Sequence, residues 1–162
     1  ITTISVLNGG KVLSISGLIV LDIPANAVSS DMQLRLDESL IPSLPESERL
    51  GSNGYQFTAP TTKLNEVAFI TLPVDLPVPA IHSVLIAELR DGHWFEIAGT
   101  EFSPGSNTAK ARIYTLTTYA VVFRPITKRT YSINESCDPS ATQQTLSFVH
   151  VADLHSNFNE PE

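Results

Sequence analysis

The chain has 162 residues, of which 42% are hydrophobic and 17% are charged, and its formal net charge is −7. This length suits one ordinary domain with some residues to spare. The acidic balance excludes a nucleic-acid backbone and disfavours an anionic membrane surface as partners, because both attract faces rich in Lys and Arg.

Residues 1–124 predict an all-β domain, an antiparallel β-sandwich. Short runs with alternating or β-branched residues follow one another between turn residues, a pattern typical of sandwiches and barrels. These runs are TTISVL, KVLSIS, LIVLDI, MQLRLD, EVAFITL, HSVLIAEL, HWFEIA, AKARIYTL and TYAVVF. Asn8-Gly9-Gly10 and Asp91-Gly92 predict tight turns, since Asn, Asp and Gly tolerate positive φ. The sequence contains no run of about 18 apolar residues, so it predicts no transmembrane helix.

Two segments should depart from the sheets. Glu38–Gly54 predicts a loop with one helical turn near Ser43–Glu48, where a proline and acidic residues favour a helix start. Pro73, Pro77 and Pro79 lack amide donors, so their segment should lie at a sheet edge or leave the sheet. The side chains expected to be mostly buried are Ile15, Leu21, Leu36, Phe69, Leu85, Trp94, Ile113 and Val121.

After residue 124 the composition becomes polar. Residues 125–144 contain two prolines and little periodicity, which is typical of a linker. Residues 145–162 open with TLSFVHVA, an apolar run that predicts a buried strand of a new domain. Without that domain the strand is an orphan, so we expect residues 147–151 to pair with an edge of the sandwich or of a second copy, as a homodimer formed by strand exchange. Cys137 is the only cysteine and cannot form an internal disulfide.

The sandwich carries a family resemblance over residues 8–123. Gly9-Gly10-Lys11-Val12, followed by the strand Leu21-Asp22-Ile23-Pro24 and by Ala25-Asn26-Ala27-Val28, resembles the opening of the domain shared by zonula occludens proteins and netrin receptors. Bacterial relatives of that domain have Ile-Pro-x-Gly-Ala, and this chain has Asn26 where they have glycine. Asn is the next-best residue for a left-handed backbone, so the turn can form. The resemblance implies a scaffold or interaction role and names no ligand.

Some domains similar to this one cleave themselves in the last strand, at His-Phe-Ser or His-Leu-Thr. Here the matching residues are Thr115-Leu116-Thr117. Thr117 matches the nucleophile that would attack the carbonyl of Leu116, but Thr115 replaces the histidine that would accept the hydroxyl proton. Threonine cannot act as a base near neutral pH, so this autoproteolysis-like vestige is predicted to be inactive.

The end of the chain resembles a different family. Phe148-Val149-His150-Val151-Ala152-Asp153-Leu154-His155 resembles the first motif of calcineurin-like metallophosphoesterases, closest to the 5′-nucleotidase branch. Residues i and i+2 of an extended segment point the same way, so Asp153 and His155 can hold one cation together. The resemblance implies two divalent ions (Mn, Zn or Fe) in the full-length enzyme. His150 is more typical of a packed histidine than of a ligand.

The remaining metal motifs of that family do not occur in this chain. Two ligands make no catalytic centre, and neither His82 nor His93 has a ligand partner at metal spacing. We therefore expect no cofactor in the chain itself, and an inactive N-terminal accessory domain whose partner is a downstream catalytic domain that hydrolyses nucleotides or another phosphate ester. The alternative is a stand-alone cell-surface binding or adhesion module, although Trp94 is more typical of a core residue than of a sugar-stacking one. We expect a periplasmic or secreted location.

Overall fold

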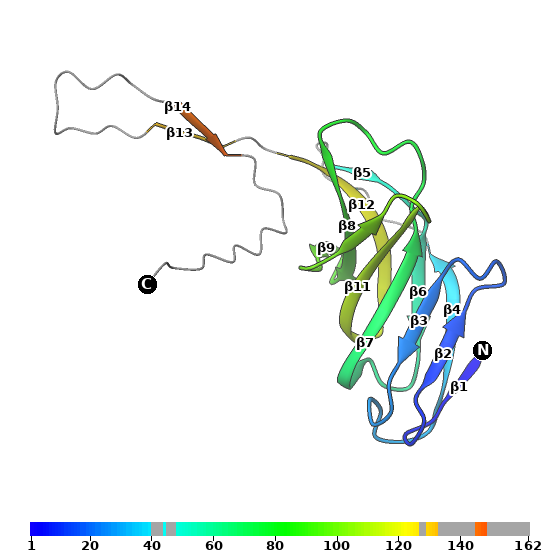
Figure 1. Ribbon diagram of the computed structural model, residues 1–162. Coiled ribbons are helices and arrows are strands. Elements are labelled where there is room, and N and C mark those ends of the chain that lie inside the picture. The colour runs from blue at the N-terminus through cyan, green and yellow to red at the C-terminus, as the bar shows by residue number, and fades with distance from the viewer. Residues whose placement is uncertain (40–43, 45–47, 127–128, 133–144, 149–162) are drawn as a thin grey trace, which may run out of the picture. The chain divides into compact units, whose positions relative to one another are not determined.

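The structure is a computed structural model that describes residues 1–39, 44, 48–126, 129–132 and 145–148. The chain divides into two compact units, residues 1–125 and residues 126–162. In the described residues the secondary structure is entirely β (Figure 1), so this part of the chain has no helix that could cross a membrane. The predicted all-β class is confirmed.

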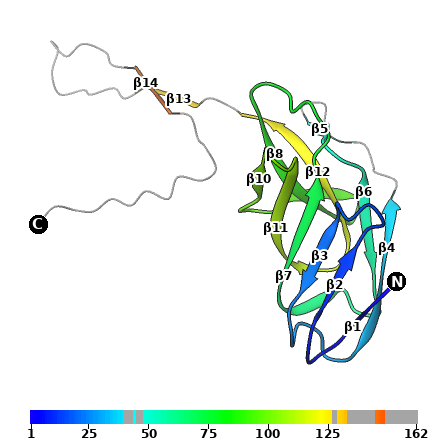
Figure 2. The ribbon, with the colours of Figure 1, turned by 45° about the vertical axis from the view of Figure 1, so that its right-hand side comes forward.

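The first unit is a sandwich of two antiparallel sheets. The first sheet has the order β1-β4-β6-β12-β8-β9, with β5 also paired to β12, and the second has the order β10-β11-β7-β3-β2. Figure 2 shows the two layers from the side of β2 and β3. The strands are β1 (Thr2–Ile4), β2 (Gly10–Leu13), β3 (Val20–Ile23), β4 (Met32–Ser39), β5 (Arg49–Leu50), β6 (Gly54–Thr58), β7 (Lys63–Pro73), β8 (His82–Arg90), β9 (His93–Glu96), β10 (Glu101–Ser103), β11 (Thr108–Thr115) and β12 (Thr118–Pro125).

The core lies between the sheets and is filled by alternate residues of each strand. In β11, for example, Ala109, Ala111 and Ile113 are buried while the residues between them face outward. Tyr119 of β12 is fully buried, and its ring meets that of Phe57 edge-on with centroids 6.2 Å apart. Such aromatic pairs add to the stability that burial alone provides.

The predicted core residues divide into three groups. Leu21, Ile113 and Val121 are buried as predicted, whereas Leu36, Phe69, Leu85 and Trp94 are only half-buried. Ile15 was predicted wrongly, because β2 ends at Leu13 and Ile15 lies fully exposed in the turn before Gly17. Alternation of apolar and polar residues indicates which side chains are buried only within a strand, and Ile15 lies beyond the end of β2.

Positive φ angles occur at the turns that the sequence predicted. Asn26 has φ of 64°, the left-handed backbone expected where the related pattern has glycine. Asp91 and Gly92 have φ of 49° and 79° and join β8 to β9, with Arg90 facing His93. Gly9 has φ of 66°, and a Cβ there would lie 2.1 Å from the carbonyl oxygen of Ile23. Only glycine fits that position without displacing the backbone.

The two segments expected to leave the sheets have different outcomes. After Pro73 the chain leaves β7 and crosses to β8 in the other sheet, as predicted. The helical turn predicted near residues 43–48 falls mostly outside the described residues. The described part of the Glu38–Gly54 segment contains the short strand β5 instead, and Ser52 Oγ accepts a 2.8 Å hydrogen bond from the amide of Val121.

The second unit contains two described strands, β13 (Arg129–Ser132) and β14 (Thr145–Phe148). They pair with each other in antiparallel register, with Thr130 opposite Ser147. Residue 147 therefore pairs with a strand within the predicted linker, and not with an edge of the sandwich as expected. The homodimer formed by strand exchange stays a prediction. Residues 149–151 lie outside the described residues. Thr130 and Tyr131 are β-branched and aromatic residues, which favour a strand. Pairing with a strand nearby in the sequence closes a shorter loop, and so costs less entropy, than pairing with a distant edge of the sandwich.

Candidate functional site

The two predicted metal ligands, Asp153 and His155, lie outside the described residues, as do His150 and Cys137. In the described ranges no group of three or more His, Cys, Asp or Glu side chains is arranged to hold a metal ion. His82 Nδ1 lies 2.8 Å from the carbonyl oxygen of Ala80.

The autoproteolysis-like residues lie in the turn between β11 and β12. Leu116 is buried, and its amide donates a 2.6 Å hydrogen bond to the carbonyl of Thr62. The carbonyl of Thr117 accepts a 2.9 Å hydrogen bond from the amide of Phe57. The turn is therefore tied into the sandwich on both sides of the bond between Leu116 and Thr117.

The hydroxyl of Thr117, the candidate nucleophile, is hydrogen-bonded to a backbone carbonyl group. The hydroxyl of Thr117 donates to the carbonyl oxygen of Leu89 at 3.0 Å. An amide carbonyl does not remove a proton near neutral pH, so this contact does not activate the hydroxyl for attack. The hydrogen bond joins the turn to β8.

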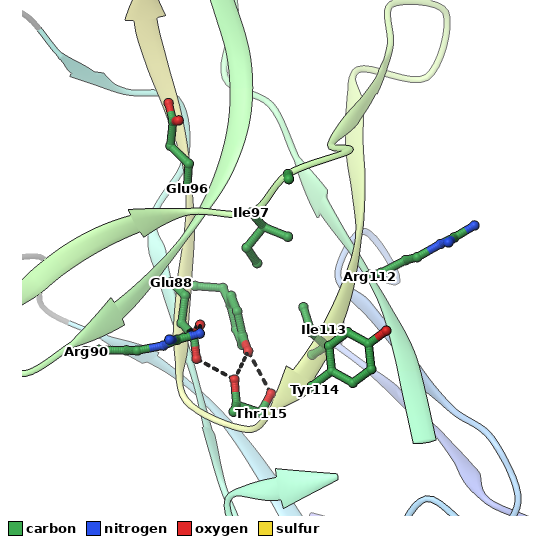
Figure 3. A pocket seen from close by; sticks show the side chains of 10 residues that line it. Glu88, Arg90, Glu96, Ile97, Arg112, Ile113, Tyr114 and Thr115 are labelled. Atoms are coloured by element: carbon green, nitrogen blue, oxygen red, sulfur yellow. Dashed lines mark hydrogen bonds and ion pairs between the residues drawn. The ribbon is translucent and has the colours of Figure 1, made fainter. Parts of the chain in front are cut away.

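The side chain of Thr115 joins a polar cluster that faces a pocket of about 410 Å³. Its hydroxyl donates to Glu88 Oε1 and lies 3.0 Å from the hydroxyl of Tyr119, which in turn donates to the carbonyl of Thr115 at 2.7 Å. Figure 3 shows Glu88 and Thr115 on one side of this pocket, with Ile97 and Ile113 forming an apolar wall. The side chain of Thr115 is thus fully engaged in hydrogen bonds within the sandwich.

Glu88 is the unusual member of this cluster, because its carboxylate is almost completely buried. Its Oε2 accepts a 2.7 Å hydrogen bond from Nε of Arg90 and forms an ion pair with the same guanidinium. A buried carboxylate is costly unless it is paired and hydrogen-bonded. Here both oxygens have donors, from Arg90 and Thr115. Because the Arg90 side chain is 57% exposed, solvent screens the pair and limits its contribution to stability.

The cluster also changes the acidity of its members. Burial raises the pKa of Tyr119 well above its ordinary value, with a smaller contribution from the negative charge of Glu88. The hydrogen bond to Glu88 raises the pKa of Arg90. Tyr119 therefore remains a hydrogen-bond donor over the physiological range and offers no base to a substrate.

Sequence reasoning missed Glu88, Arg90 and Tyr119 as a cluster. A signal was present in HSVLIAELR, where Val84, Ile86 and Glu88 share one face of the strand. An acidic residue at the inward positions of an apolar strand requires a buried partner. The partner, Thr115, is 27 positions away and becomes apparent only when β8 and β11 are placed in space.

Comparisons with known proteins leave the family open. No protein-family model matches the chain, and no curated protein matches it.

Proposed function

We propose that the chain is the N-terminal accessory domain of a metal-dependent phosphoesterase, together with the first strand and first metal-binding motif of its catalytic domain. In the full-length protein, Asp153 and His155 would bind the metal ions that activate water against a phosphate ester. The sandwich would provide a scaffold or interaction surface and take no part in the chemistry.

One observation carries this proposal: a self-contained sandwich precedes a separate apolar strand that leads to Asp-x-His. Residues 1–125 form one compact unit. Beyond it, a strand begins at Thr145, and the residues that follow it read VHVADLHSNF. A carboxylate and an imidazole two residues apart can hold one cation together where the chain is extended, which is what a two-metal hydrolytic site requires of its first segment.

The test uses the full-length natural protein that contains this chain. Its hydrolysis of bis(p-nitrophenyl) phosphate is measured with and without Mn²⁺. Metal-dependent turnover should fall at least about a hundredfold in Asp153→Ala and in His155→Ala, because removing a ligand or its orientation typically costs that much. His93→Ala is the matched control, since His93 is exposed in a hairpin of the sandwich, and it should retain full activity.

Two outcomes would overturn the proposal. One is a full-length protein without metal-dependent turnover of any phosphate ester in a panel of mono- and diesters. The other is an Asp153→Ala variant that keeps wild-type activity. Either result would remove the reason to regard the Asp-x-His pair as a metal motif.

A further inference from the structure

The pocket of about 410 Å³ beside Glu88 lies between the two sheets of the sandwich. Its lining residues come from β8 and β12 of the first sheet, from β11 of the second sheet, and from the chain that follows β9. Arg90 and Tyr114 line it, and since the Arg90 side chain is 57% exposed and Tyr114 is 60% exposed, the pocket is open to solvent on their side. A volume of this size lies within the range of small-molecule sites.

The pocket has one polar wall and one apolar wall. The carboxylate of Glu88 and the hydroxyls of Thr115 and Tyr119 form the polar wall, and Ile97 and Ile113 form the apolar wall (Figure 3). A hydrocarbon ligand would remove water from the polar wall without replacing its hydrogen bonds, and a small inorganic ion would gain nothing from the apolar wall. The pocket therefore suits a ligand with polar groups along one side and C–H groups along the other.

The ion pair of Glu88 and Arg90 keeps hydrogen-bonding capacity that the sandwich does not use. The carboxylate accepts from Nε and Nη2 of Arg90 and from the hydroxyl of Thr115, whereas a carboxylate offers about four acceptor positions. Among the described residues, Nη1 of Arg90 has no hydrogen-bond partner. The pair thus presents an acceptor and a set of donors side by side. Two neighbouring hydroxyl groups match this arrangement, because one can donate to the carboxylate while the other accepts from the guanidinium.

The charges around the pocket are balanced where they face it. The negative charge of Glu88 is paired with Arg90, and that of Glu96 is paired with Arg124. Figure 3 shows the side chains of Glu96 and Arg112 directed away from the middle of the pocket. A charged ligand would therefore lose its hydration without meeting an unpaired charge of opposite sign, which is unfavourable. The pocket selects a ligand without net charge.

Folding alone does not account for an acidic residue at position 88. Val84 and Ile86 precede it on the same inward face of β8, and both are buried in the core, so an apolar residue at 88 would continue that core. Replacing a buried ion pair by apolar residues of similar size is often neutral or stabilising. The sandwich therefore gains little stability from this buried carboxylate, and binding of a polar ligand gives it a role that packing does not.

We propose that this pocket binds a neutral pyranose sugar. Two neighbouring hydroxyls of the sugar would bond to the Glu88–Arg90 pair, and the C–H groups of its ring would contact Ile97 and Ile113. The exposed ring of Tyr114, beside Ile113 at the mouth of the pocket, would add an aromatic surface for the same C–H groups (Figure 3). A pyranose has this combination of hydroxyl pairs, C–H faces and zero charge. The inference does not depend on the phosphoesterase proposal.

The experiment is an NMR titration of the 162-residue chain, labelled at its isoleucine methyl groups, with the methyl glycosides of glucose, galactose, mannose and N-acetylglucosamine. At least one glycoside should shift the methyl signals of Ile97 and Ile113. Glu88→Gln should weaken that binding about tenfold or more, because it removes a charge-assisted hydrogen bond. The matched control is Asp37→Asn. Asp37 pairs with Arg35 two residues away on β4, as Glu88 does with Arg90 on β8, but it lines no part of the pocket, so binding should not change.

Ala98→Phe separates binding from folding. Ala98 lines the pocket and is exposed, so a phenyl ring there should block the sugar while the urea midpoint stays unchanged. The proposal is overturned if no glycoside shifts the two methyl signals at its highest soluble concentration, or if Asp37→Asn weakens binding as much as Glu88→Gln. It is also overturned if cyclohexanol, which lacks a hydroxyl pair, binds as tightly as the sugar, or if glucuronate or glucosamine binds more tightly than the neutral glucoside.

Discussion

Tyr119→Phe should destabilise the sandwich because it removes one hydroxyl from a closed polar cluster. Tyr119 is fully buried, and its hydroxyl donates to the carbonyl of Thr115 at 2.7 Å. The substitution keeps the ring and its contact with Phe57 but removes the donor to that carbonyl, while the hydroxyl of Thr115 keeps its hydrogen bond to Glu88. Leaving a buried polar group unpaired costs about 1–3 kcal/mol, and we expect the free energy of unfolding to fall by that amount at neutral pH.

The same residue should determine part of the pH dependence of stability. Burial raises the pKa of Tyr119 above its ordinary value of 10.0, so in the folded state the tyrosine keeps its proton where the unfolded chain loses it. The stabilisation is fully present below pH 10 and is lost as the pH rises through the folded value. The wild-type chain should therefore lose stability above about pH 10, and Tyr119→Phe should show a shallower decline. The pKa of Tyr55 is also raised by burial, so Tyr55 contributes in the same direction.

The assay is urea denaturation of residues 1–162, followed by fluorescence at pH 7.5 and at pH 10.5. Tyr114→Phe is the matched control, since that ring is 60% exposed, and surface substitutions usually change stability by less than about 0.5 kcal/mol. The reasoning is refuted if the two variants lose the same stability at pH 7.5. It is also refuted if Tyr119→Phe and the wild-type chain lose equal stability between the two pH values.

The remaining predictions concern the turns and the chemistry of the chain. Gly9→Ala should abolish folding or cost at least about 3 kcal/mol, because its Cβ would meet the carbonyl of Ile23 at positive φ; Gly92→Ala, with nothing within 4 Å, should cost about 1 kcal/mol in the same denaturation series. The bond at Leu116–Thr117 should remain intact, because Thr115 supplies no base; two fragments in an intact-mass measurement after incubation would contradict this. The 162-residue chain should not hydrolyse a phosphodiester with Mn²⁺, Zn²⁺ or Fe²⁺, and turnover abolished by removal of the metal would show that the chain holds more ligands than we infer.

Much of the fold followed from local chemistry that the sequence displays directly. Asn26 and the Asp91-Gly92 pair were predicted correctly because the preference for positive φ belongs to the residue itself. Ile15 was placed wrongly because alternation does not reveal where a strand ends. The strand β13 was missed because its partner β14 makes it a strand, and pairing is a property of two segments.

The polar cluster shows a second limit of sequence reasoning. Thr115 was identified through its place in a cleavage motif, but the residue that bonds it, Glu88, lies 27 positions earlier in another strand. In the neighbouring sequence, only the inward position of Glu88 in β8 distinguishes it from a surface glutamate. Conversely, Asp153 and His155 could be proposed as a pair from the sequence alone, because a spacing of two residues is a local pattern; both lie outside the described residues.

The metal content of the full-length protein tests the central claim most directly. The protein is stripped with a chelator, equilibrated with Mn²⁺, and measured by elemental analysis beside the isolated sandwich, residues 1–125. The account predicts about two ions per full-length chain, none on the sandwich, and a loss of bound metal in the double variant Asp153→Ala/His155→Ala. Two ions retained by that variant, or no metal on the full-length protein, would contradict it.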